Sequence, residues 1–489
     1  MRQHGCEAPA LFILAAISCH LVAHRLQRFA QTGHVAMAEN AKAAAADAGF
    51  HPVDHDELVH QIPHDGLSLG QSDAACCSGH LSCRPCLIRP VQSGLARCDV
   101  SRYIFCNRLQ QLSRNGEIMG EIGIGLVGGG YMGKAHAVAL SAVGAVFNTA
   151  LRPRLEMIAA SSAQTAEQYR KAYGFARATG NWQDLVADQR VEAVVIASPQ
   201  STHRAIALAA FAAGKPVFCE KPLGASLEDA RAMTAAAEAS GLPNMIGFNY
   251  VRTPATQFVR QLLAEGAIGQ LTWFRAEHAE DFLADPDLPA TWRTSGQANG
   301  AMGDLAPHII NATLALLGPI AEVSARIETV HASRPGPHGP VAVDNDDQAQ
   351  IMLRFATGVM GHLFISRVAT GRKMGYAYEI HGTKGAIRFD QEDQNAVWLY
   401  RAEGPQAQRG FTRTLTGPDH PDYAAFCQGP GHGTGYQDQI IIEARDFLAA
   451  IATGSAVWPT FRDGLAVSQI IDTAFRSAAE GRWQAVPHL

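Results

Sequence analysis

The chain has 489 residues, of which 47% are hydrophobic and 17% charged, and its formal net charge is −5 at pH 7. This composition is typical of a globular protein and is long enough for two or three domains. The acidic balance excludes the basic surface that nucleic-acid binding needs, and no apolar run reaches the roughly 18 residues of a membrane span.

The first 118 residues differ in composition from the rest. Most of the cysteines precede Met119, and they are Cys6, Cys19, Cys76, Cys77, Cys83, Cys86, Cys98 and Cys106. Only Cys219 and Cys427 follow. The later part therefore has no disulfide framework, and we expect a reduced, cytoplasmic protein. No sustained apolar periodicity joins residues 1–118.

Three interpretations of residues 1–118 stand side by side. Residues 9–19 have the apolar core of a secretion signal, although Glu7 lies in front of it. Cys83 and Cys86 suit a zinc site, although a second ligand pair at the usual spacing is missing. We favour the third interpretation, a disordered extension or a start codon assigned too early, and we expect no metal.

A glycine-rich turn opens the next segment. The apolar run 122–127 reads as a strand and meets Gly128, Gly130 and Gly133, and a helical run follows from Tyr131. This is G-x-G-x-x-G between a strand and a helix, the context in which the pattern is informative. The glycines allow a tight turn close to a pyrophosphate, whose charge the helix N-terminus favours. The pattern predicts a dinucleotide site.

Strands and helices alternate through the remainder of residues 119–242, which predicts a parallel sheet in a Rossmann domain. Right-handed crossovers place the carboxyl ends of all its strands on one edge. The residues expected at those ends are Ser198, Pro199, Glu220, Lys221, Asn249 and Tyr250, and all but the proline are polar.

The end of the second strand bears on the choice of cofactor. NAD-binding domains usually carry an acidic residue there, which holds the ribose hydroxyls. This chain has Ser161 and Ser162 instead, which would tolerate a 2′-phosphate, and Arg170 follows a turn or two later. We expect NAD or NADP, with a slight preference for NADP.

The chain resembles the glucose–fructose oxidoreductase / inositol dehydrogenase (Gfo/Idh/MocA) family from about Gly120 to its end. The resemblance rests on the glycine turn and on the segments 198–224, 247–254 and 300–318. It implies an α/β fold with a second α/β domain over residues 243–489, built on a large, mostly antiparallel open sheet. It also implies a homodimer or homotetramer.

Asp304 and His308 lie four residues apart in a helical run, so both side chains would share a face. On their own they fit a capping aspartate and a buried histidine. The resemblance implies instead that Lys221, Asp304 and His308 are catalytic. A neutral imidazole can accept a proton near pH 7, and the ammonium of Lys221 would stabilise a developing alkoxide.

The same reasoning assigns the surrounding residues. The predicted cofactor site comprises Gly128, Gly130, Tyr131, Met132, Gly133, Ser161, Ser162, Ser198, Pro199, His203, Glu220 and Lys221. The predicted substrate site comprises Lys221, Tyr250, Arg252, Asp304, His308, His432 and Tyr436. Two of these assignments keep alternatives, since His203 could simply cap its helix and residues 429–436 could be a plain surface loop.

We therefore expect NAD(P)-dependent oxidation of a secondary hydroxyl of a sugar, an inositol-like polyol or an anhydrosugar. One alternative is redox-assisted glycoside cleavage, in which transient oxidation of a sugar carbon permits elimination. Another is a regulator that senses NAD(P) without catalysis, although such a protein has no need for a proton acceptor.

Overall fold

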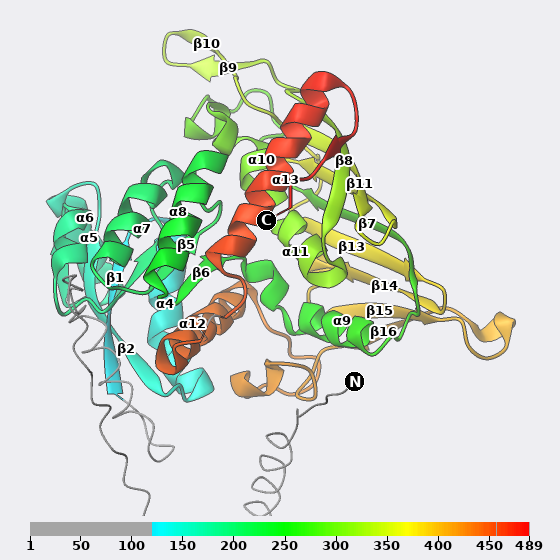
Figure 1. Ribbon diagram of the computed structural model, residues 1–489, viewed down its shortest axis with the longest axis horizontal. Helices are drawn as coiled ribbons and strands as arrows, with labels where there is room; N and C mark the ends of the chain where they lie inside the picture. The colour runs from blue at the N-terminus through cyan, green and yellow to red at the C-terminus, as the bar shows by residue number, and fades with distance from the viewer. Residues whose placement is uncertain (1–119, 456, 489) are drawn as a thin grey trace, which may run out of the picture. The chain divides into compact units, whose positions relative to one another are not determined.

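The computed structural model describes residues 120–455 and 457–488 (Figure 1). The predicted extension, with its secretion-signal and zinc alternatives, and Met119 lie outside the described residues. Within the described ranges, no helix is long and apolar enough to cross a membrane.

The first half of the described chain forms a six-stranded sheet in the order β3-β2-β1-β4-β5-β6, and every pairing in it is parallel. This confirms the predicted Rossmann arrangement. The strands are β1 (Gly120–Val127), β2 (Leu151–Ala159), β3 (Arg177–Thr179), β4 (Ala193–Ile196), β5 (Val217–Glu220) and β6 (Asn244–Gly247). The sheet thus extends beyond residue 242, and β3, with three residues, is too short to leave a periodic pattern.

Apolar residues cover both faces of this parallel sheet. The helices are α4 (Tyr131–Phe147), α5 (Ala163–Tyr173), α6 (Trp182–Ala187), α7 (His203–Ala212) and α8 (Leu227–Ser240). Within β4, Val194 packs in the core that contains α7 and α8, whereas its neighbour Val195 packs in the core that contains α4. Successive strand residues point to opposite faces, so a strand buried on both sides reads as a continuous apolar run.

The second half contains a nine-stranded sheet in the order β16-β15-β14-β13-β7-β12-β11-β8-β17. Its strands are β7 (Leu271–Ala279), β8 (Ile320–Glu328), β11 (Gln348–Phe355), β12 (Met360–Ser366), β13 (Gly375–Gly382), β14 (Gly385–Asp390), β15 (Ala396–Arg401), β16 (Phe411–Leu415) and β17 (Gln484–Ala485). All pairings are antiparallel except that of β7 with β12, which confirms the predicted large sheet. A separate hairpin joins β9 (Ser333–Gly336) to β10 (Gly339–Ala342).

One face of this second sheet is buried and the other is open. Burial alternates strictly along β11, with Ile351 and Leu353 inside and Met352 outside. The helices of this half are α9 (Pro254–Ala264), α10 (Ala301–Asp304), α11 (Ala306–Leu317), α12 (Tyr436–Thr453) and α13 (Phe461–Glu480).

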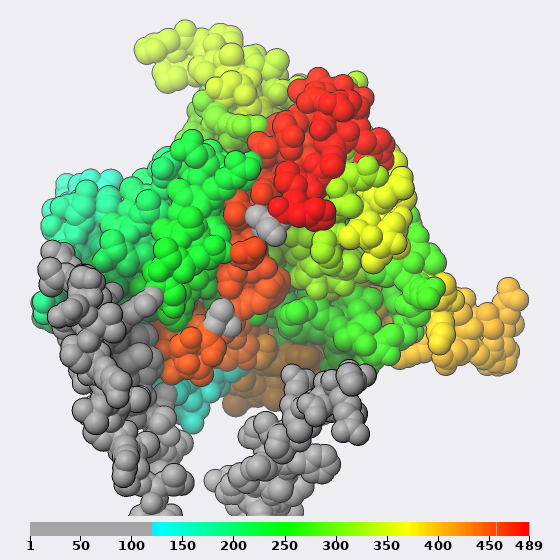
Figure 2. All heavy atoms as spheres, in the orientation of Figure 1, coloured from blue at the N-terminus to red at the C-terminus, as the bar shows by residue number. Residues whose placement is uncertain are grey.

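Helix α13 joins the two sheets into one unit. It lies between α8 on one side and β8 on the other, and its surface separates the two halves in the space-filling view (Figures 1 and 2). At its start, the carbonyl of Phe461 accepts a hydrogen bond from Thr234 of α8. Near its end, Ser477 accepts one from the amide of Ala325 in β8. The face of the parallel sheet that packs on α7 and α8 consequently shares one hydrophobic core with the buried face of the second sheet.

Candidate active site

The glycine turn after β1 has the shape that a dinucleotide requires. Gly128 has φ +99° and donates its amide to the carbonyl of Ala159 at 2.9 Å. A Cβ at Gly133 would overlap the Gly128 carbonyl, so the helix can pack on the turn only without one. Gly130 faces open space, and no side chain among the described residues caps α4. Its first N–H groups are thus left for an anion such as a pyrophosphate.

Two tyrosines of α5 support this turn, and the sequence analysis missed them. The hydroxyl of Tyr173 donates to the carbonyl of Gly129 at 2.7 Å. Tyr169 stacks on Tyr173 with ring centroids 5.4 Å apart, and a Cβ at Gly129 would overlap its ring. Gly129 therefore has a packing role, although it is not part of the glycine fingerprint.

The serines after β2 are exposed, and one of them has a structural role. Ser162 accepts a hydrogen bond from the amide of Thr165 at 3.1 Å and so caps α5. The guanidinium of Arg170 is bound on the same helix by both carboxylate oxygens of Glu167, at 2.7 and 2.9 Å. Ser161 is exposed beside them.

His203 connects the loops that follow β4 and β5. Its Nε2 lies 2.9 Å from the carbonyl oxygen of Ser198, and its Nδ1 lies 3.0 Å from that of Pro222. The ring is buried, so these contacts hold the two loops at a set spacing. Pro199, which follows Ser198, is exposed.

Lys221 and Asp304 meet across the two halves of the chain. The Lys221 Nζ lies 2.7 Å from Asp304 Oδ1 and also donates to the Asp304 carbonyl at 2.8 Å. Arg293, which the sequence analysis missed, contacts Oδ2 of the same carboxylate at 2.5 Å. Burial favours the neutral acid, but the charges of Lys221 and Arg293 outweigh it and hold the pKa of Asp304 well below its usual value.

His308 lies beside this group, against aromatic rings. Its ring centroid is 4.5 Å from that of Tyr250 and 5.5 Å from that of His278. Its Nδ1 is buried and has no hydrogen-bond partner among the described residues. Burial first, and then the Lys221 and His278 charges, lower the pKa of His308 well below its usual value. The imidazole is therefore neutral at pH 7 and able to accept a proton.

The helical run that carries Asp304 and His308 is broken, contrary to the single helix expected. Helix α10 ends at Asp304 and α11 begins at Ala306, because Pro307 has no N–H to continue the ladder. His278 in β7 bonds the carbonyl of Leu305 between the two helices, with its Nδ1 at 2.9 Å. On its other side, Nε2 lies 3.1 Å from Glu280. The sheet thus fixes the junction through a histidine that no sequence motif marked.

Two further contacts fix the start of α10. The carboxylate of Asp346 accepts a hydrogen bond from the amide of Met302 at 2.7 Å. The buried guanidinium of Arg367 donates to the carbonyls of Arg293 at 2.7 Å and Asn299 at 3.0 Å. Both partners precede Asp304 in the chain, so Arg367 sets the path of the backbone that leads to it.

The remaining predicted residues do not all lie near Lys221 and Asp304. The rings of Tyr131 and Tyr436 lie 6.1 Å apart, and the Tyr436 hydroxyl donates to Sδ of Met132 at 3.3 Å, beside the glycine turn. Arg252 is not in this group, since its guanidinium binds Asp446 and the carbonyl of Trp458, each at 2.6 Å. His432 is exposed in the loop before α12. The substrate roles of Arg252 and His432 stay predictions.

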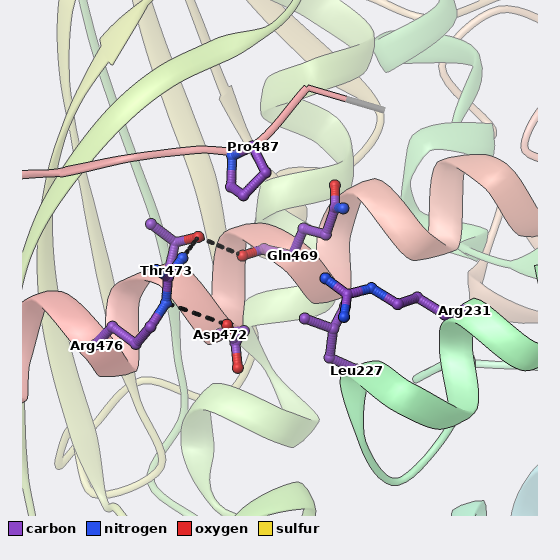
Figure 3. A pocket seen from close by; sticks show the side chains of 7 residues that line it. All are labelled: Leu227, Arg231, Gln469, Asp472, Thr473, Arg476 and Pro487. Carbon is purple, nitrogen blue, oxygen red and sulfur yellow. Dashed lines mark hydrogen bonds and ion pairs between the residues drawn. The ribbon is translucent and has the colours of Figure 1, made fainter.

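A surface hollow of about 490 Å³ lies elsewhere, between α8 and α13 (Figure 3). Its side chains include Arg231 and also Arg476, which pairs with Asp472 of its own helix at 3.3 Å. None of the predicted site residues lines it. Among residues 120–455 and 457–488, no group of three or more histidine, cysteine or acidic side chains could hold a metal ion.

Comparison with known proteins gives relatives for both halves. Residues 122–248 match the oxidoreductase family with an NAD-binding Rossmann fold, and residues 256–388 match the GFO/IDH/MocA C-terminal domain. Levoglucosan dehydrogenase of Pseudarthrobacter phenanthrenivorans is 37% identical over 390 residues, 76% of this chain and 100% of its own. Inositol 2-dehydrogenase of Rhizobium meliloti is 30% identical over 364 residues, 73% of this chain and 97% of its own.

Solved structures agree with these sequence matches. Levoglucosan dehydrogenase in complex with NADH and L-sorbose has a TM-score of 0.74 and 37% identity, covering 76% of this chain and 100% of its own. An NAD-binding oxidoreductase from Klebsiella pneumoniae has a TM-score of 0.72 and 36% identity over the same shares. With both of its halves matched and its glycine turn intact, the chain belongs to the Gfo/Idh/MocA family of oxidoreductases.

Proposed function

We propose that the protein oxidises a secondary hydroxyl of a sugar, polyol or anhydrosugar with a nicotinamide dinucleotide. The observation that carries the proposal is the contact of Lys221 with Asp304. It joins the edge of the dinucleotide-binding sheet to the helix junction of the second domain. His308, a neutral base, is close enough to this group for the Lys221 charge to lower its pKa.

Each residue has a role that its environment favours. Lys221 Nζ would face the alcohol oxygen and stabilise the negative charge that develops as the proton leaves. His308 would take that proton through its Nε2, since Nδ1 is buried. Asp304, kept ionised by two cations, would orient the ammonium. The nicotinamide, when bound, accepts the hydride from the same carbon.

The relatives support the substrate class without naming the substrate. The names of the curated relatives include levoglucosan, inositol 2- and D-apiose dehydrogenases. All three substrates are polyhydroxylated rings or small sugars, so the shared requirement is a secondary hydroxyl within reach of a base and a cation.

For the cofactor, we propose NAD, with NADP tolerated. The sequence alone favours NADP slightly because no acidic residue follows β2. In the structure, both carboxylate oxygens of Glu167 bind the guanidinium of Arg170, so this guanidinium is not free to bind a 2′-phosphate. This pairing weakens the preference for NADP. Related structures bind NADH, and the exposed Ser161 does not repel either cofactor.

A substrate panel tests the proposal. Steady-state assays with levoglucosan, myo-inositol, D-apiose and glucose, each with NAD and NADP, should show reduced cofactor forming with at least one of them. We expect kcat/KM to be about tenfold higher with NAD. Release of a glycosidic leaving group without net NADH would indicate glycoside cleavage instead. Cofactor binding without turnover of any sugar would favour a sensor.

Substitution of Lys221 tests the mechanism. Lys221→Ala should lower kcat by about 10²–10³, the usual effect of removing one charge-stabilising donor. The Kd for NAD, measured by fluorescence titration, should stay near the wild-type value. Lys384→Ala, at an exposed turn between β13 and β14, is the matched control and should leave both quantities unchanged. Full turnover in Lys221→Ala would remove the proposed role.

The pH dependence of kcat/KM tests His308. Because burial and the neighbouring charges lower its pKa, the neutral base persists below pH 6.5. On the acid side, kcat/KM should therefore fall only below pH 6.5, which is the ordinary pKa of histidine. In Lys221→Ala the residual activity should fall at a higher pH than in wild type, because one lowering charge is gone. An acid limb at or above pH 6.5 in the wild type would contradict the assignment.

We also propose that the protein forms a homodimer or homotetramer through the open face of the nine-stranded sheet. The strand registers align Trp398, Glu379, Arg275 and Met352 across this face, and Trp273 lies two residues from Arg275 on the same side. Trp273, Met352 and Trp398 are exposed large apolar side chains there. Exposed apolar patches of this kind mark interaction surfaces.

Sedimentation velocity tests the assembly. The wild-type protein should sediment as a dimer or tetramer, and Trp273→Glu with Met352→Glu should shift it to a monomer because the charges oppose burial of the face. The paired substitution Glu265→Gln with Gln261→Glu, at the C-terminal end of α9, should not change the assembly. A wild-type monomer at micromolar concentration would overturn this proposal.

A further inference from the structure

A buried histidine on the dinucleotide-binding helix contacts the residue that precedes Lys221. His136 lies in the second turn of α4, whose N-terminus is the predicted site of the phosphates, and it is 3% exposed. Its Nε2 lies 2.7 Å from Oε1 of Glu220, the last residue of β5. The same ring packs edge-on against Phe218 with centroids 4.8 Å apart. Helix α4 and the end of β5 are therefore joined by a polar contact and a ring contact.

Glu220 is confined on every side that the structure describes. It is 6% exposed, and its other oxygen, Oε2, accepts a hydrogen bond from the backbone amide of Lys221 at 3.3 Å. A Cβ at Gly247, on the neighbouring strand β6, would approach Oε1 of Glu220 to 3.0 Å. The absence of a side chain at Gly247 therefore makes room for the carboxylate. One carboxylate consequently holds a side chain of α4 and the backbone of Lys221 together.

A second acid lies behind this pair. Glu443 of α12 is fully buried, and neither of its oxygens has a hydrogen-bond partner among the described residues. Burial, and then the neighbouring Glu220 charge, raise the pKa of Glu443 well above its usual value, which favours its neutral form. Glu443 makes no hydrogen bond to Glu220 or His136, so its substitution supplies a matched control.

We propose that His136 and Glu220 are positioning residues, which transmit occupation of the dinucleotide site at the N-terminus of α4 to the backbone of Lys221. The inference rests on the proposed function, because it assigns Lys221 its catalytic place. The route runs from the first turn of α4 to His136 and Glu220, then to the Lys221 amide, and from the Lys221 ammonium to Asp304. Binding of the cofactor would then restrict the backbone of Lys221 and so hold its ammonium in place.

Hydrogen exchange tests this link without any turnover. ADP-ribose carries the two phosphates of NAD and lacks the nicotinamide. In wild type, its binding should slow exchange of the Lys221 amide by at least about threefold. In His136→Gln the slowing should disappear while ADP-ribose still binds. Equal exchange with and without ADP-ribose in wild type, or the same slowing in His136→Gln, would overturn the proposal.

Kinetics provide an independent readout. His136→Gln should lower kcat by about 10–100-fold and change the KM for NAD by less than about threefold, because a misplaced group impairs the chemical step more than binding. In the Lys221→Ala background, His136→Gln should cause no further loss, since both act through one group. Multiplicative losses in the double variant would show that His136 has a merely structural effect.

Controls separate the possible failures. Glu443→Gln keeps the shape and charge of the neutral acid and should leave kcat and exchange unchanged. If His136→Gln does not fold, as judged by thermal melting, Glu220→Asp shortens the link and takes its place. If the wild-type protein turns over no sugar, the proposed function is wrong. The exchange experiment would still show whether His136 and Glu220 connect the dinucleotide site to Lys221.

Discussion

The ion pair between Lys221 and Asp304 is the interaction on which the site depends. The two residues lie 83 positions apart in sequence, one in the loop after β5 and the other at the end of α10, yet their side chains meet at 2.7 Å. Both are partly shielded from water, where the attraction between opposite charges is stronger than in bulk solvent. Arg293 adds a second cation to the same carboxylate at 2.5 Å. Removing the Asp304 side chain would leave Lys221 and Arg293 without the carboxylate that they share.

This arrangement also explains the state of His308. Burial disfavours a positive charge on the imidazole, and the charge of Lys221, one of the two cations that keep Asp304 ionised, acts in the same direction. One cluster therefore holds an acid ionised and a base neutral at the same pH. In the proposed mechanism, a base that accepts a proton from an alcohol needs this state, and the ammonium of Lys221 would supply the balancing charge for the alkoxide.

The sequence could predict what depends on local pattern. The glycine turn was recognisable because its constraints lie within six residues, from Gly128 to Gly133, and the structure shows each of them. The parallel sheet followed from the alternation of strands and helices. The pairing of Lys221 with Asp304 and His308 came from resemblance to a family, because nothing in the spacing of two distant motifs indicates that they meet.

The parts that sequence reasoning missed depend on tertiary contacts. Arg293 and His278 act on the site through a loop and a strand, in segments whose local pattern is that of ordinary surface and sheet. Nor did the sequence indicate that the guanidinium of Arg252 contacts Asp446 and Trp458 in the interior, and the substrate role of Arg252 stays a prediction. Pro307 indicates the helix break at Leu305, but the apolar residues on both sides of it follow a helical period, which suggested one continuous helix. Short strands such as β17, with two residues, carry no period to detect.

A crystal structure of the complex with NAD and a substrate that is turned over would show whether Lys221 and His308 face the reacting hydroxyl. We expect this hydroxyl to lie roughly 2.6–3.2 Å from both Lys221 Nζ and His308 Nε2. We also expect the carbon that bears it to face the nicotinamide. A substrate bound with this hydroxyl out of reach of Lys221, or with another group positioned to take its proton, would contradict the proposed mechanism.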